Sequence, residues 1–277
     1  MSENPESVNA ESVNESVVDL EVDERATHQT VRSVTRALDI MGQFTDGSTR
    51  ARSIADIVEA SGLAKTTVIR LLYTLESEGL LASTSRGYIP GPSLWRWARA
   101  ANQAWELPPQ ARAVMKQLVE REKETVNLFI RRGRTRICVA QEESPLPLRH
   151  VVHIGDQLPL VSGASSKVLL SQVSADNVQH VYVGAHASAP PLDVLVADLE
   201  MVRAQGFAVS HGEREEGISA VGAPVRAESG EVVAALTYSG PTLRFPEERI
   251  PGLANALMAA AATLSTLGID HPLRSIN

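Results

Sequence analysis

The chain has 277 residues and a formal net charge of −7, and 43% of its residues are hydrophobic. This length suits two domains, and the apolar share is enough to build ordinary globular cores. No apolar run approaches the roughly 18 residues of a membrane-spanning helix, and the acidic N-terminus lacks the apolar stretch of a signal peptide. Because Cys138 is the only cysteine, neither an internal disulfide nor a multi-cysteine zinc site is possible. We expect a cytoplasmic protein that is not bound to a membrane, with Cys138 as a buried thiol.

The acidic balance comes from one segment. The first 25 residues contain eight acidic side chains and a single arginine, which together account for the whole net charge. Residues 1–27 are rich in serine, asparagine and glutamate, and such a composition cannot bury enough apolar surface to offset the entropy of ordering. We expect residues 1–27 to be a disordered acidic tail, and the rest of the chain is balanced enough to carry a local basic surface.

Residues 28–92 predict three helices and a hairpin. Apolar side chains three and four residues apart predict a first helix near residues 31–41. Ser53, with Asp56 three residues later, has the spacing of a capping box at the start of a second helix that ends before Gly62. A third helix follows with a glycine at its C-terminal cap, and a small β-hairpin comes directly after it.

The segment 53–79 has the layout of a helix-turn-helix, and the hairpin occupies the place of a wing. In such units the second helix enters the major groove with its N-terminal residues at the base edges. Here those residues are small, hydroxylated or basic, and the hairpin tip adds a cation. We predict that double-stranded DNA is contacted by Arg52, Lys65, Thr66, Thr67, Arg70 and Arg86. The alternatives are a helical hairpin that only packs a core and a module that binds other proteins, and specific retardation of a DNA fragment would distinguish them.

The rest of the chain predicts a linker helix over 93–109 and a second domain over 110–270. Trp95, Trp97 and Trp105 on the linker suit dimer contacts and packing within the chain equally well. Strands are expected at 126–131, 135–141, 149–154, 218–226 and 232–239, and helices at 110–123, 165–172, 175–183, 192–205 and 246–268, the last one kinked or restarted at Pro251. Strands that arrive as hairpins with helices packed on them indicate an α+β domain with a mostly antiparallel sheet.

Three stretches resemble the IclR family of transcription regulators, and the resemblance covers residues 28–268. The first two are the opening helix at 31–40 and the helix-turn-helix at 62–79. The third is a C-terminal signature carried by Gly206, Ser210, Glu213, Ala220, Val221, Gly222 and Val225. Arg226 and Ala227 depart from that signature, which has an aromatic residue or histidine and then Asp or Asn.

A further stretch, Leu158-Pro159-Leu160 leading to Lys167, also matches, with Val161 in place of the usual histidine and Ser166 in place of glycine. The resemblance implies a winged helix-turn-helix, a linker helix and a GAF-like effector domain. It also implies a homodimer or a dimer of dimers on a (pseudo)palindromic operator. It leaves open whether the protein is a repressor or an activator.

A turn of small residues at 161–166, entering a helix, is the predicted sensing site. Backbone N–H groups at a helix start favour an anion such as a carboxylate, although a plain N-cap explains the serines as well. The family's effector-contacting positions fall on His150, Ala164, Ser165, Ser210, Ile218, Ala220, Thr237 and Ser239. Within each of the last two strands the paired positions share parity and can face one pocket. We predict a small organic acid, or a close derivative, as the effector.

Catalytic and metal-binding functions have little support. Gly163-Ala164-Ser165-Ser166-Lys167 matches neither G-x-S-x-G, nor S-x-x-K, nor a phosphate-binding loop. His150 and His153 would point to opposite faces of the expected strand, which makes them poor joint metal ligands. We therefore predict no catalytic residue, no cofactor and no metal.

Overall fold

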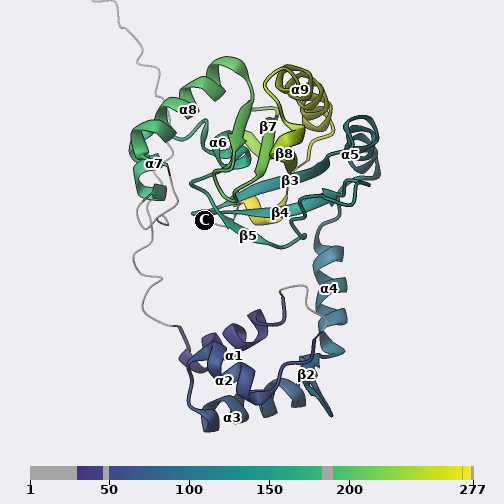
Figure 1. Ribbon diagram of the computed structural model, residues 1–277, viewed down its shortest axis with the longest axis vertical. Coiled ribbons are helices and arrows are strands. Elements are labelled where there is room, and N and C mark those ends of the chain that lie inside the picture. The colour runs from purple at the N-terminus through teal and green to yellow at the C-terminus, as the bar shows by residue number, and fades with distance from the viewer. Residues whose placement is uncertain (1–29, 46–49, 183–189, 270, 276–277) are drawn as a thin grey trace, which may run out of the picture. The chain divides into compact units, whose positions relative to one another are not determined.

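The computed structural model describes residues 30–45, 50–182, 190–269 and 271–275. The tail expected over 1–27 lies outside the described residues. The chain divides into two compact units, Met1–Ala101 and Asn102–Asn277, and the division falls inside the segment expected to be a linker (Figure 1). No helix of the described part is long and apolar enough to cross a membrane.

Unit 1 is a winged helix-turn-helix, as predicted. Its helices are α1 Arg32–Gly42, α2 Ile54–Ser61 and α3 Lys65–Ser77, and its two antiparallel strands are β1 Leu81–Thr84 and β2 Gly87–Pro90. The helices and the first strand enclose a small core formed by Ile40, Ile57, Val68, Leu72, Leu75 and Leu81.

The helix-turn-helix geometry follows from its capping residues. The Ser53 amide donates to the Asp56 carboxylate at 2.9 Å, and the Asp56 amide donates to Ser53 Oγ at 3.2 Å, so the predicted capping box is present. These bonds to Ser53 hold the pKa of Asp56 below its usual value. Gly62 ends α2 with a φ of 65°, which lets the chain turn within three residues into α3.

Helix α1 buries a different face from the one that its most regular apolar spacing suggests. Ile40 is fully buried, and Met41 packs against the same core. Val31, Val34 and Leu38 are 63%, 54% and 62% exposed, so they form an apolar stripe on the outside of unit 1.

Helix α4, Ser93–Ala104, follows the wing, and α5, Pro109–Glu122, is the first helix that lies wholly in unit 2, with Pro108 and Pro109 at its start. Trp95 and Trp97 are 78% and 67% exposed. Trp105 behaves differently, because it packs against the core of unit 2 with its ring centroid 4.3 Å from that of His271.

Unit 2 is built on one six-stranded antiparallel sheet with the order β5-β4-β3-β8-β7-β6. The strands are β3 Thr125–Arg132, β4 Thr135–Glu142, β5 Gln157–Pro159, β6 Ala208–His211, β7 Ile218–Arg226 and β8 Val232–Pro241. The predicted α+β class and antiparallel sheet are confirmed.

Helices cover both faces of this sheet (Figure 1). Helices α5 and α9, Ile250–Thr266, pack on one face over the larger apolar core. Helix α6, Ala164–Leu170, packs on the other face against β7 and β8, with α7, Ala175–Tyr182, and α8, Leu192–Gln205, outside it. Pro251 lies in the first turn of α9, so it starts this helix and does not kink it. Two short 3₁₀ turns, Thr242–Arg244 and Pro272–Ser275, complete the described unit.

The strand expected at 149–154 is wrong, because this segment is irregular. The edge of β4 is already occupied: β5 pairs with residues 135–137, and the Cys138 amide donates to the Asp156 carbonyl. These contacts extend the ladder as far as Cys138, and residues 149–154 do not continue it. Cys138 itself is buried and free, as expected, and burial raises its pKa to about 12.

Candidate nucleic-acid interface and ligand pocket

Helix α3 presents the predicted DNA-contacting side chains on its outer face. Lys65, Thr66 and Arg70 are exposed and Thr67 is half-buried, while Val68 and Leu72 hold the helix on the core. The N-terminal half of the helix thus offers two cations and two hydroxyls, a set that can reach phosphates and base edges together.

Two residues on this face did not figure in the prediction. Ile69 is 44% exposed and Tyr73 is 72% exposed, and they follow Lys65 at steps of four residues. An exposed apolar side chain can meet a thymine methyl group, and a tyrosine hydroxyl can reach a phosphate. The helical period that places Val68 and Leu72 inward would also have shown Ile69 and Tyr73 on the outside.

The wing adds the remaining predicted contacts. Arg86 is exposed in the two-residue turn between β1 and β2, where its amide donates to Thr84 Oγ1 at 3.2 Å. Arg52 pairs with Tyr88 through two backbone hydrogen bonds of 2.9 and 2.8 Å, so the chain before α2 lies along the outer wing strand. Five of the six predicted residues therefore belong to α3 or the wing, and Arg52 is hydrogen-bonded to the wing strand β2.

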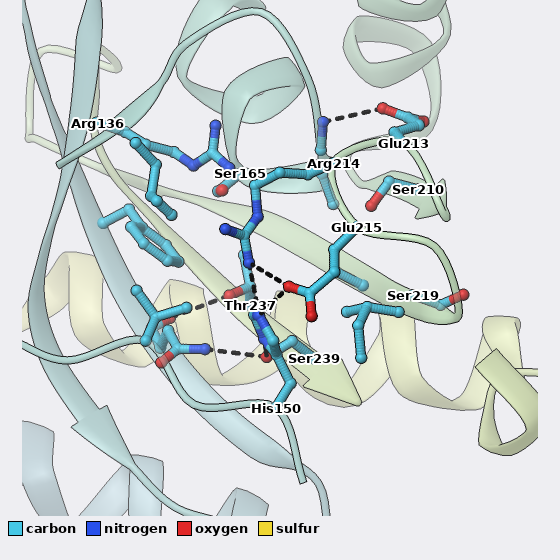
Figure 2. A pocket seen from close by; sticks show the side chains of 18 residues that line it. Arg136, His150, Ser165, Ser210, Glu213, Arg214, Glu215, Ser219, Thr237 and Ser239 are labelled. Atoms are coloured by element: carbon cyan, nitrogen blue, oxygen red, sulfur yellow. Dashed lines mark hydrogen bonds and ion pairs between the residues drawn. The ribbon is translucent and has the colours of Figure 1, made fainter. Parts of the chain in front are cut away.

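Unit 2 contains a pocket between the sheet and the start of α6 (Figure 2). Its walls enclose about 460 Å³ of empty space, a figure that includes the open mouth. The structure brings all eight predicted effector positions to this pocket: His150, Ala164, Ser165, Ser210, Ile218, Ala220, Thr237 and Ser239.

Strand register explains why residues so far apart in sequence share the pocket. On the paired strands β7 and β8, Ala220 lies opposite Ser239 and Gly222 lies opposite Thr237. A Cβ atom on Gly222 would press on Thr237 and on Val168 of α6, so this glycine lets α6 pack directly on the sheet. The small-residue turn before α6 then closes one side of the pocket.

A carboxylate of the protein itself, that of Glu213, lies at the start of α6. The Gly163 amide donates to Glu213 Oε2 at 2.9 Å, and Glu213 Oε1 lies 2.6 Å from the Lys167 ammonium. Lys167 Nζ also contacts Asp198 at 2.7 Å and donates to the Val209 carbonyl at 3.1 Å. Lys167 and the signature residue Glu213 thus form, with Asp198, a closed network at the pocket wall. The free N–H group at this helix start is therefore already taken by a carboxylate of the protein itself.

The pocket is also lined by two arginines that the prediction did not contain. Arg136 of β4 is 2% exposed, and its guanidinium donates to the Ser162 carbonyl at 2.9 Å and to Pro159 O and Ser166 Oγ. Burial, and then the charge of Arg214, lower its pKa to about 9. The sequence contains a signal for this burial. Arg136 and the buried Cys138 are two residues apart on a predicted strand, so their side chains lie on the same face of it.

The second arginine, Arg214, reaches across the pocket toward His150 and Glu215 (Figure 2). Its terminal nitrogen lies 2.6 Å from His150 Nε2 and 3.4 Å from a Glu215 oxygen. Burial, followed by the Arg214 charge, holds the pKa of His150 below its ordinary value. Because a guanidinium can only donate, Nε2 accepts, and the ring proton lies on Nδ1 facing Ser239 Oγ at 3.0 Å. Within the described part of the chain, no group of three or more His, Cys, Asp or Glu side chains could hold a metal ion.

Comparison with known proteins matches both units. Residues 33–85 match the model of the IclR helix-turn-helix domain, and residues 100–266 match that of the bacterial transcriptional regulator IclR C-terminal domain. The chain is 29% identical to the HTH-type transcriptional regulator BhcR of Paracoccus denitrificans, over 85% of this chain and 86% of that one. It is 30% identical to the regulator KdgR of Escherichia coli, over 84% of this chain and 92% of that one.

Solved structures give the same picture. A crystal structure of an IclR transcriptional regulator from Alicyclobacillus acidocaldarius aligns with a TM-score of 0.71 and 28% identity, covering 87% of this chain and all of that one. A crystal structure of an IclR-family transcriptional regulator from Rhodococcus sp. aligns with 39% identity and a TM-score of 0.57, covering 88% of this chain and 96% of that one.

Proposed function

The chain belongs to the bacterial IclR family of transcriptional regulators, and we propose that a small organic acid in the pocket of unit 2 changes the affinity of unit 1 for a (pseudo)palindromic operator. One observation carries the proposal. Eight positions assigned to an effector from sequence, spread over nearly ninety residues, line a single pocket on a chain whose other unit is a winged helix-turn-helix.

The DNA-binding side of the proposal rests on α3 and the wing. Lys65, Thr66, Thr67 and Arg70 are assigned to the major groove, and Arg86 and Arg52 to the flanking backbone. The additional exposed side chains Ile69 and Tyr73 extend the same surface. An effector that favours one state of the protein would change DNA affinity by about 1–3 kcal/mol, the usual range of such coupling.

Arg70→Ala tests the DNA-binding assignment. If Arg70 reads a base, we expect the free energy of operator binding to weaken by about 1–3 kcal/mol. If Arg70 contacts a phosphate, we expect the slope of log affinity against log salt concentration to fall by about one. The measurement is a mobility-shift titration on the DNA that flanks the protein's own gene. Arg132→Ala is the matched control, because it removes an exposed arginine from unit 2. Equal affinities for both variants and the unmodified protein would contradict the role of Arg70.

A homodimer, or a dimer of dimers, is the proposed assembly, because a palindromic operator presents two equivalent half-sites. Exposed Trp95 and Trp97 on α4 support it, since tryptophan often carries much of the free energy of an interface. We expect Trp95→Ser combined with Trp97→Ser to raise the dimer dissociation constant by about tenfold or more, measured by analytical ultracentrifugation. Tyr73→Ser removes an equally exposed aromatic residue from the DNA face and should leave dimerisation unchanged.

A further inference from the structure

The pocket contains a buried cation that lacks an ion pair. Every hydrogen bond that Arg136 makes goes to an uncharged oxygen, and among the described residues no carboxylate lies within ion-pair distance of it. Its Nε is shielded from water and has no hydrogen-bond partner. A buried guanidinium in this state is costly, and an anion beside it would recover part of the cost.

A second guanidinium lines the same pocket, and the two arginines repel each other. The carboxylates nearby offset this only in part. Both oxygens of Glu213 are already engaged, by Gly163 and Lys167, and the Glu215 side chain is 57% exposed to solvent. An anion bound between Arg136 and Arg214 would relieve the repulsion and satisfy both side chains.

At the sheet, the pocket holds an unsatisfied acceptor. Asn127 is 1% exposed, and its Nδ2 donates to Ser239 Oγ at 3.1 Å. Its Oδ1 is buried without a partner. Ser239 Oγ also accepts from His150 Nδ1, and a hydroxyl on a ligand would give Asn127 Oδ1 the donor that it lacks.

Hydroxyl and ammonium groups are the common donors on small metabolites, and the charges of the pocket separate them. An ammonium group would lie in a site that already holds two guanidinium groups and would be repelled. A hydroxyl donates without adding charge.

We propose that the pocket selects a small hydroxylated organic acid, with its carboxylate against Arg136 and Arg214 and its hydroxyl donating to Asn127 Oδ1. This inference rests on the proposed function of the pocket and narrows its ligand from acids in general to hydroxy acids. It assigns three residues that the effector positions predicted from sequence do not include.

Isothermal titration of the full-length protein with matched pairs of acids tests the inference: glycolate and acetate, 3-hydroxybutyrate and butyrate, and 4-hydroxybenzoate and benzoate. We expect at least one hydroxy acid to bind about ten- to a hundredfold more tightly than its partner without the hydroxyl. In Asn127→Ala this preference should vanish, while the affinity of the acid without the hydroxyl changes less than twofold.

Two arginine variants test the carboxylate end. Arg214→Gln and Arg136→Gln should each weaken both acids of a pair by about tenfold or more. Arg214→Gln is decisive if Arg136→Gln fails to fold, since Arg136 also holds the turn before α6. Arg132→Gln, outside the pocket, should bind like the unmodified protein.

The outcomes separate the two proposals. Acids that bind and change operator affinity without any preference for the hydroxyl would overturn this inference and leave the proposed function standing. Binding that is unaffected in Arg214→Gln would overturn the assigned place of the carboxylate. Absence of binding by all six acids would reject both the acid pocket and this inference.

Discussion

Replacing Lys167 by methionine should lower the free energy of unfolding of unit 2 by about 3–5 kcal/mol. Lys167 is 6% exposed, and its ammonium lies between Glu213 and Asp198. Methionine fills a similar volume without a charge, so it would leave two facing carboxylates without a counterion. Their side chains are 22% and 20% exposed, and because water still reaches them, we expect a value near the lower end of that range.

The measurement is urea unfolding of the full-length variant followed by a signal from unit 2. Lys116→Met, at an exposed position of α5, is the matched control and should change stability by less than about 0.5 kcal/mol. Adding Glu213→Gln and Asp198→Asn to Lys167→Met should recover most of the loss, because no unpaired charge then remains. A loss in Lys167→Met no greater than that of Lys116→Met would contradict the account of this network.

The same network shows what the sequence could and could not predict. Lys167 and Glu213 stood out as members of a family motif, but Asp198 comes from a helix whose pattern predicts only an amphipathic surface. Strand parity correctly brought Ile218, Ala220, Thr237 and Ser239 to one face. Successive side chains of a strand point to opposite faces of the sheet, so residues two apart share a face wherever the strand begins or ends.

Predictions were less accurate where the outcome depends on which segment pairs with a strand or which face of a helix packs on the core. Residues 149–154 have the composition of a strand, yet the pairing along β4 reaches only from β5 to residues 155–156, and residues 149–154 are irregular. Helix α1 has two candidate apolar faces, and the packing of unit 1 chooses the one with Ile40. Arg136 was overlooked because a lone arginine in a strand usually reaches solvent. Its burial depends on the turn at 159–166, which supplies the oxygens that it contacts.

Gly87→Ala should remove most of the stability of unit 1 and, with it, operator binding. Gly87 has a φ of 127°, and a Cβ atom there would overlap the carbonyl of Arg52, which is hydrogen-bonded to the next wing residue. The unfavourable φ costs about 1–2 kcal/mol, and separating the two backbone segments adds about 1–3 kcal/mol. We therefore expect a total of about 3 kcal/mol, a large part of what so small a unit possesses.

Gly62→Ala is the control that separates the cost of an unfavourable φ from the cost of the Cβ overlap at Gly87. Gly62 lies in the same unit with a φ of 65°, but nothing lies within 4 Å of the position that its Cβ would take. It should cost about 1 kcal/mol, from backbone conformation alone. Hydrogen exchange of the full-length protein measures both variants. In Gly87→Ala, protection should fall in α2, α3 and the wing and persist in β3 and β8 of unit 2. If both variants lost equal protection, the contact between Arg52 and the wing strand would not be what positions the wing, and Arg52 and Arg86 would lose their shared structural basis as DNA contacts.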